Sequence, residues 1–233
     1  MWAVLPVKAF SKAKQRLKGV LSDEQRASLS RSMLVDSIRA LAQVDAITDI
    51  VLVVQQAVES LVLTADDDEI TIEKVTIIEQ PEHVLGLNAS LRYACDVVID
   101  KHVNQVIILP TDMPLMTADA IQRLCCQALA YDVTLVPDAD NKGTNGLVTS
   151  LPLMLPLLYG NQSFIAYHQA ARQNQLNLHV HRDPLLALDI DKPQDLEYLL
   201  QTYRCKRDDI GKHTRQWLDQ CQGDLLIAQC ESV

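Results

Sequence analysis

Short runs of consecutive aliphatic and β-branched residues recur along the chain, and most are separated from the next by a stretch in which apolar residues have helical spacing. Such runs are typical of strands buried on both faces of a parallel sheet, with the helices as crossovers. The predicted strands are 2–7, 50–54, 75–78, 106–109, 133–136 and 178–180. The predicted helices are 22–41, which opens on a Ser22-x-x-Gln25 capping box, and 87–99, 118–130, 163–173 and 193–203. The pattern therefore predicts an α/β fold with a mostly parallel sheet.

Length and composition favour one large domain with a short appendage. A chain of 233 residues with 48% hydrophobic residues can bury a sizeable core. Residues 1–203 carry the strand and helix pattern and form the predicted domain. The more polar tail, 204–233, is predicted to be helical and to pack on the body or on a neighbouring subunit. The apolar stretch 147–159 contains two prolines, so it is expected to be a buried, turn-rich segment.

The charge balance argues against one class of partner. The formal net charge is −9, from 30 acidic residues against 21 lysines and arginines. Binding to a nucleic-acid backbone requires a broad basic face, so no nucleic-acid partner is expected. The six cysteines form no C-x-x-C pair, and no run of eighteen apolar residues occurs. We therefore expect reduced thiols, a cytoplasmic location and no membrane partner.

Positive charge is concentrated directly after the first predicted strand. Open α/β sheets bind ligands at the carboxyl ends of their strands, so this loop predicts a polyanionic small molecule such as a nucleoside triphosphate. The alternative is an ordinary solvated basic loop. Because the loop has no apolar periodicity, Lys14→Ala or Arg16→Ala is expected to change stability by less than about 0.5 kcal/mol. The basic residues are Lys8, Lys12, Lys14, Arg16 and Lys18.

Two acidic motifs stand where a cation could bind. Asp112 follows the predicted strand 106–109 between two prolines, so it should emerge at the ligand-binding edge of the sheet. In an extended segment, Asp189 and Asp191 would point to the same side and could share a hard cation through oxygen ligands. The alternative for either motif alone is a turn or helix-capping aspartate.

Three glycine-containing segments could approach a ligand closely. Gly86-Leu87-Asn88 lies at a predicted helix start, where free backbone N–H groups favour a nucleotide and Asn88 could contact a base or ribose. The segment 143–146 is interpreted as a turn suited to a phosphate or carboxylate, and so is 160–164, in which Ser163 opens a helix. Ordinary capping and turn chemistry is the alternative for each.

Taken together and in order, these motifs resemble the phospholactate guanylyltransferases of coenzyme F-420 biosynthesis. The resemblance spans residues 2 to about 200 and implies a three-layer, Rossmann-like nucleotidyltransferase fold of the GT-A-like type. It also implies an enzyme that joins GMP from GTP to 2-phospho-L-lactate, phosphoenolpyruvate or 3-phospho-D-glycerate and releases diphosphate. The motifs are Pro6-Val7-Lys8, Lys14-x-Arg16-Leu17, Gly86-Leu87-Asn88, Leu109-Pro110-x-Asp112-x-Pro114, Gly143-Thr144-Asn145, Gly160-x-x-Ser163-Phe164 and Leu188-Asp189-Ile190-Asp191-x-Pro193-x-Asp195-Leu196.

The resemblance assigns a role to each group of residues. It implies a catalytic set of Lys8, Lys14, Arg16 and Asp112, with the basic side chains stabilising the departing diphosphate. It implies that GTP is held by Pro6, Lys8, Gly86, Asn88 and Pro110, and the phosphoacid by Thr144, Gly160 and Ser163. Magnesium (Mg²⁺) would be held by Asp112, Asp189 and Asp191. The implied partners are GTP and a small phosphoacid, and a homodimer is compatible with the sequence.

Other functions fit the sequence less well. Sugar-phosphate nucleotidyltransferases usually carry a G-x-G-T/S-R-M-type loop after the first strand, which is absent here. A silent nucleotide-binding module would have little reason to keep all three aspartates, and a serine hydrolase would need G-x-S-x-G. His179-Val-His181 is interpreted as an exposed strand pair rather than a metal site.

Overall fold

The computed structural model describes residues 1–55 and 74–230, with backbone alone over 222–230. Seven strands form one sheet in the order β3-β2-β1-β4-β6-β5-β7. The strands are β1 (Trp2–Val7), β2 (Asp49–Val54), β3 (Val75–Glu79), β4 (Gln105–Ile108), β5 (Val133–Pro137), β6 (Thr144–Ser150) and β7 (Leu178–Val180). All neighbouring pairs are parallel except those that involve β6, which runs antiparallel to β4 and β5. The predicted α/β fold with a mostly parallel sheet is confirmed.

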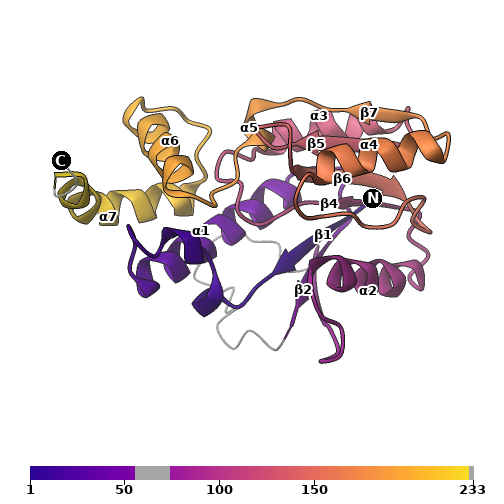
Figure 1. The fold of residues 1–233 in the computed structure, drawn as a ribbon, viewed down its shortest axis with the longest axis horizontal. Helices are drawn as coiled ribbons and strands as arrows, with labels where there is room; N and C mark the ends of the chain where they lie inside the picture. The colour runs from indigo at the N-terminus through magenta and orange to yellow at the C-terminus, as the bar shows by residue number, and fades with distance from the viewer. Residues whose placement is uncertain (56–73, 231–233) are drawn as a thin grey trace.

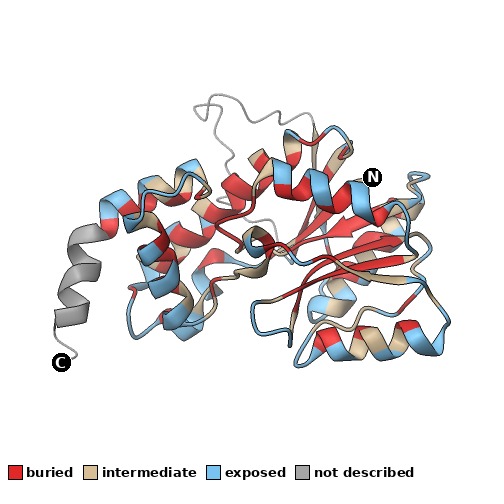
Figure 2. Ribbon diagram, turned by 90° about the horizontal axis from the view of Figure 1, so that it is seen from above, coloured by how far each residue is buried: buried red, intermediate tan, exposed pale blue. Residues whose placement is uncertain are grey.

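Helices cover both faces of the sheet and complete three layers (Figure 1). Helices α1 and α3 share one buried apolar cluster with alternate residues of β1 and β2, whereas α2 and α4 share a second cluster with the intervening residues. Figure 2 shows the result, with the central strands largely buried and exposed outer faces on the helices, whereas the edge strands β3 and β7 are only partly buried or exposed. The helices are α1 (Asp23–Ala42), α2 (Leu87–Ile99), α3 (Ala118–Ala128), α4 (Ser163–Gln173), α5 (Pro184–Ala187), α6 (Pro193–Arg204) and α7 (Lys212–Cys230).

Strand β6 corrects one prediction. The segment 143–146 is interpreted from the sequence as a turn, but all of it except Gly143 forms the start of this strand, which continues into the expected turn-rich stretch as far as Ser150. A Cβ atom at Gly146 would lie 2.8 Å from Val136 Cγ2 and 3.1 Å from Leu109 Cδ2, so glycine here permits close packing between strands. Asn145 and Gly146 have low strand propensity, and the conformation here is therefore set by pairing with β5 rather than locally.

The tail forms α7, which packs against α1 (Figure 1). Trp217 and Leu218 lie in a third apolar cluster with residues of α1 and α6. The start of α7 is capped by a side chain from another helix, because Asp36 of α1 accepts hydrogen bonds from the backbone N–H groups of His213 (2.9 Å) and Thr214 (2.8 Å). The division of the chain at residue 203 stays a prediction. Over the described residues, none of the helices is long and apolar enough to span a bilayer.

We predict that Asp36→Ala destabilises the protein by about 1–2 kcal/mol, because two buried N–H groups at the start of α7 lose their acceptor. The measurement is the free energy of unfolding from urea titration. Asp45→Ala is the matched control, since Asp45 is exposed beyond the end of the same helix. Equal stability of the two variants would contradict this role for Asp36.

Candidate active site

A cavity of about 440 Å³ lies at the carboxyl ends of β1 and β4. Its walls come from the loop after β1, the turn 110–112 after β4, and the side chains of Ser30 and Met33 on α1. Leu87, at the start of α2, closes part of it. This is the edge of a parallel sheet at which ligands bind. The placement brings seven predicted site residues to one cavity, namely Pro6, Lys8, Lys14, Arg16, Pro110, Asp112 and Asp191.

The loop after β1 is more ordered than a solvated loop would be. It contains two short 3₁₀ helices, Phe10–Lys12 and Gln15–Leu17, whose residues Phe10 and Leu17 are buried in the apolar clusters. Lys14 lies between these helices in the left-handed region, with φ 53° and ψ 40°. A non-glycine residue in that region has a backbone cost, which tertiary contacts of its side chain can offset.

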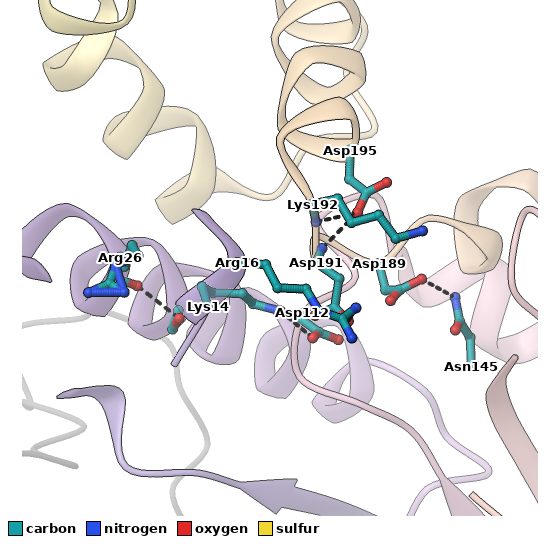
Figure 3. Close-up of polar contacts among 10 residues, drawn as sticks. Lys14, Arg16, Arg26, Asp112, Asn145, Asp189, Asp191, Lys192 and Asp195 are labelled. Carbon is teal, nitrogen blue, oxygen red and sulfur yellow. Dashed lines mark hydrogen bonds and ion pairs between the residues drawn. The ribbon is translucent and has the colours of Figure 1, made fainter. Parts of the chain in front are cut away.

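Lys14 makes those contacts with both acidic motifs. Its Nζ forms ion pairs with Asp112 and with Asp191, the latter at 3.4 Å, and its side chain is only 7% exposed (Figure 3). Arg16 is largely exposed and reaches Asp191 at 3.5 Å. Burial alone would lower the pKa of Lys14, but the Asp112 and Asp191 carboxylates outweigh it and raise the pKa. The ammonium is therefore charged at neutral pH, and the expectation that Lys14 is a surface residue is wrong.

Hydrogen bonds hold the segment that carries Asp189 and Asp191 beside Asp112. The backbone N–H of Ile190 donates to the carbonyl of Asp112 (3.1 Å). Asp195 Oδ2 accepts from the backbone N–H groups of Asp191 (2.8 Å) and Lys192 (2.7 Å), which shapes the turn into α6 (Figure 3). The family motif in the sequence contains Asp195, but only the structure reveals this structural use of its carboxylate.

The three predicted metal ligands have unequal surroundings. Burial, followed by repulsion from Asp112 and Asp191, raises the pKa of Asp189 from 3.8 to about 6. Asp112 Oδ1 is buried and accepts no hydrogen bond from any described residue. A carboxylate with an elevated pKa and an orphaned carboxylate oxygen are both features that a bound cation would relieve.

Within the described chain, no three His, Cys, Asp or Glu side chains are already gathered closely enough to hold a metal ion. The Lys14 ammonium stands between Asp112 and Asp191, where it neutralises the charge that would otherwise separate them. Magnesium commonly takes only one or two protein carboxylates and completes its shell with water and substrate phosphates. The residues therefore fit a magnesium ion that binds together with a nucleotide, and the magnesium site stays a prediction.

A second cavity of about 140 Å³ adjoins the first and shares Pro6, Leu87, Pro110 and Asp112 with it. Its remaining polar lining comes from Thr144, Asn145, Tyr159 and Asp189. Of the residues predicted to bind a phosphoacid, Thr144 lines this cavity and accepts a hydrogen bond of 3.1 Å from the buried Ser163 hydroxyl. Gly160, with φ 145°, does not line either cavity, and its Cβ position is open.

Gly86 and Asn88, at the start of α2, were predicted to contact the nucleotide, but they lie outside the larger cavity in this conformation. Gly86 has φ 87° and precedes the helix, but neither Gly86 nor Asn88 lines the larger cavity. Both atoms of the Asn88 amide are used by the backbone of Tyr159, since Nδ2 donates to its carbonyl and Oδ1 accepts from its N–H, each at 2.9 Å. Asn88 thus ties α2 to the segment before α4, and its contact with a base or ribose stays a prediction.

The histidine pair lies apart from this site and differs from its prediction. His181 is buried rather than exposed, and its Nδ1 lies 2.8 Å from Gln127 Oε1. His179 approaches the same oxygen at 3.1 Å and stacks on Tyr131. The strand pattern alone could not predict that α3 would cover His181.

Comparison with known proteins identifies the family. The model of the family described as "Guanylyl transferase CofC like" matches residues 1–222. This chain belongs to the CofC-like guanylyl transferases. It is 32% identical over 201 residues to a phosphoenolpyruvate guanylyltransferase of Roseiflexus castenholzii, covering 86% of this chain and 88% of that one. It is 31% identical over 219 residues to a 2-phospho-L-lactate guanylyltransferase of Methanothermobacter thermautotrophicus, covering 93% and 88%.

A solved structure supports the fold. A putative nucleotide-diphospho-sugar transferase from Desulfovibrio desulfuricans G20 superimposes with a TM-score of 0.76, covering 97% of this chain and 96% of that chain. At 18% identity this likeness shows the fold alone. The family match makes this chain a nucleotidyltransferase, and the likeness gives it the predicted GT-A-like architecture.

We predict that Lys14→Ala lowers the free energy of unfolding by about 1–2 kcal/mol, because it leaves two partly buried carboxylates without their shared cation. The measurement is urea unfolding of the nucleotide-free protein. Lys12→Ala is the control, since Lys12 is exposed on the same loop. If Lys14→Ala were as stable as Lys12→Ala, the ion pairs would contribute nothing to the fold.

We predict that Asp189→Asn raises the melting temperature of the metal-free protein at about pH 8. The folded pKa of about 6 exceeds the ordinary 3.8, so ionising Asp189 costs the folded state stability. That cost is absent when the pH is below the ordinary pKa of 3.8 and grows as the pH rises towards the folded pKa of about 6. Above the folded pKa the cost is complete. The gain should therefore vanish near pH 4. A variant less stable than wild type at pH 8 would contradict the raised pKa of Asp189 and the cost of ionising its buried carboxyl.

Proposed function

We propose that this chain transfers GMP from GTP to a three-carbon phosphoacid and releases diphosphate, as a step of coenzyme F-420 biosynthesis. The candidate acceptors are 2-phospho-L-lactate, phosphoenolpyruvate and 3-phospho-D-glycerate. The observation that carries the proposal is the pair of adjoining cavities that meet at Asp112, one beneath a basic loop and the other lined by hydroxyl and amide groups. Relatives named for phosphoenolpyruvate and for 2-phospho-L-lactate support the choice of acceptor.

The larger cavity suits the triphosphate. Lys8, Lys12, Lys14 and Arg16 line it, and together they match the negative charge of a nucleoside triphosphate. The same side chains would stabilise the departing diphosphate, where charge grows during the reaction. Lys14 has two roles in this account. It neutralises Asp112 and Asp191 in the nucleotide-free protein and turns towards the phosphates when GTP binds.

The smaller cavity suits the acceptor. A phosphoacid there would present its phosphate towards the shared wall at Asp112, with the basic loop on the other side. This arrangement supports in-line attack on the α-phosphorus, with the diphosphate leaving towards the loop. The attacking phosphate is already ionised, so no general base is needed. Consistent with this, no histidine of the described chain lines either cavity.

Magnesium would be held by Asp112, Asp189 and Asp191, and when bound it would offset the charge of the phosphates. A cytoplasmic location and a homodimer remain predictions. The first is supported by Cys95, Cys125, Cys126 and Cys205, whose thiols form no disulfide within the described residues.

The decisive test is diphosphate release by the purified protein with magnesium, GTP or ATP, and each acid in turn. We predict release that needs an acid and prefers GTP to ATP. Asp112→Asn keeps the size of the side chain but removes its charge, and should lose about a hundredfold or more in rate, since such an electrostatic contact is worth ~3 kcal/mol. Asp119→Asn, at an exposed position on α3, is the control.

Three results would count against the proposal. Diphosphate release with ATP at the same rate as with GTP would contradict the assignment as a guanylyltransferase. Release with a sugar 1-phosphate but with none of the acids would move the enzyme to another substrate class. Wild-type turnover by Asp112→Asn would place the chemistry elsewhere.

A further inference from the structure

Asn145 is a buried polar residue that the family motif contains but to which the sequence assigns no role. It is the second residue of β6, its side chain is 5% exposed, and it lines the smaller cavity. Strand β6 lies in the interior of the sheet between β4 and β5, and the residues on either side of Asn145 pair with β5, Thr144 with Pro137 and Gly146 with Val136. A side chain on this strand is therefore a rigid point from which a neighbouring loop can be held.

One nitrogen atom of Asn145 reaches three oxygen atoms, two at the end of α5 and one in the segment that follows it. Nδ2 donates to the carbonyls of Leu186 (3.2 Å) and Ala187 (2.9 Å), and it lies 3.4 Å from Asp189 Oδ1 (Figure 3). Two carbonyls and a carboxylate are all acceptors, so they would repel one another without a donor between them. The amide N–H₂ group supplies two protons to these three oxygens, which an aspartate or a carbonyl at this position could not do.

We infer that Asn145 is a positioning residue that fixes the carboxylate of Asp189 at the cation site, an inference that rests on the proposed function. The carboxylate of a metal ligand commonly needs a hydrogen bond from behind to hold its orientation. Asn145 supplies that hydrogen bond from the sheet, while the two carbonyl contacts hold the backbone that leads to Asp189.

A different device holds Asp191. Its backbone N–H donates to Asp195 (2.8 Å), and its carboxylate pairs with Lys14 and Arg16. Removal of the Asn145 amide should therefore change the position of the Asp189 carboxylate. It should leave Asp191 and the ion pairs of Lys14 in place. This separation gives the inference a specific signature, namely a weakened cation site with an intact basic loop.

The test measures Mn²⁺ binding to the full chain in the presence of GTP and without any acid, by titration calorimetry or by the spin resonance of free Mn²⁺. Asn145→Ala should raise the Mn²⁺ dissociation constant on the order of ten- to a hundredfold, the usual cost of removing such a supporting group. Asn145→Ser keeps one donor and should recover part of the affinity.

Turnover supplies a second readout. The magnesium concentration for half-maximal rate should rise in parallel with the Mn²⁺ dissociation constant, whereas the KM for GTP at saturating magnesium should change much less. Thr149→Val is the matched control, because Thr149 is buried on the same strand but lies outside both cavities. It should leave both quantities unchanged.

Three results would overturn the inference. The first is an Mn²⁺ dissociation constant that stays at the wild-type value in folded Asn145→Ala or Asn145→Ser. The second is a rise of that constant in Thr149→Val as large as in Asn145→Ala. The third is the absence of Mn²⁺ binding by the wild-type protein with GTP. Failure of the proposed function is distinguishable. If no acid supported diphosphate release but Asn145→Ala still weakened Mn²⁺ binding, the positioning role would stand and the proposed reaction would fall.

Discussion

The candidate site depends on one buried cation. The Lys14 ammonium pairs with Asp112 and Asp191, which come from two segments far apart in the sequence, and without it their charges would repel. The left-handed backbone at Lys14 places this ammonium between them, and the buried side chains of Phe10 and Leu17 anchor the loop on either side. A loop rich in positive charge is thus drawn over the sheet edge instead of extending into solvent. The two cavities take their shape from this contact, since Asp112 belongs to the walls of both.

The appended helix supports the same site indirectly. Asp36 holds the start of α7 against α1, and the apolar cluster of Trp217 and Leu218 adds to that contact. Helix α1 in turn carries Ser30 and Met33, which line the larger cavity. A tail that matched no motif in the sequence therefore supports one wall of the larger cavity, and the family match includes most of this tail, as far as residue 222.

The parts of this structure that could be predicted from sequence are those determined locally. The capping box at Ser22 fixed the start of α1, and the buried runs identified the parallel strands, so Asp112 could be placed at the sheet edge. Features set by distant neighbours could not be predicted. Strand β6 begins in a sequence typical of a turn. In the sequence, Lys14 cannot be distinguished from the exposed lysines near it, because its partners Asp112 and Asp191 are distant along the chain. Asn145 and Asp195 acquire their structural roles only through partners that the fold supplies.

The central claim is that GMP, and no other part of GTP, moves to the acid. It is tested most directly by incubating the protein and magnesium with phosphoenolpyruvate or 2-phospho-L-lactate and GTP labelled at either the α- or the γ-phosphorus. If GMP is the group transferred, the acid product carries the α label and the γ label appears only in diphosphate. Transfer of the γ label to the acid, or of neither label, would contradict the claim.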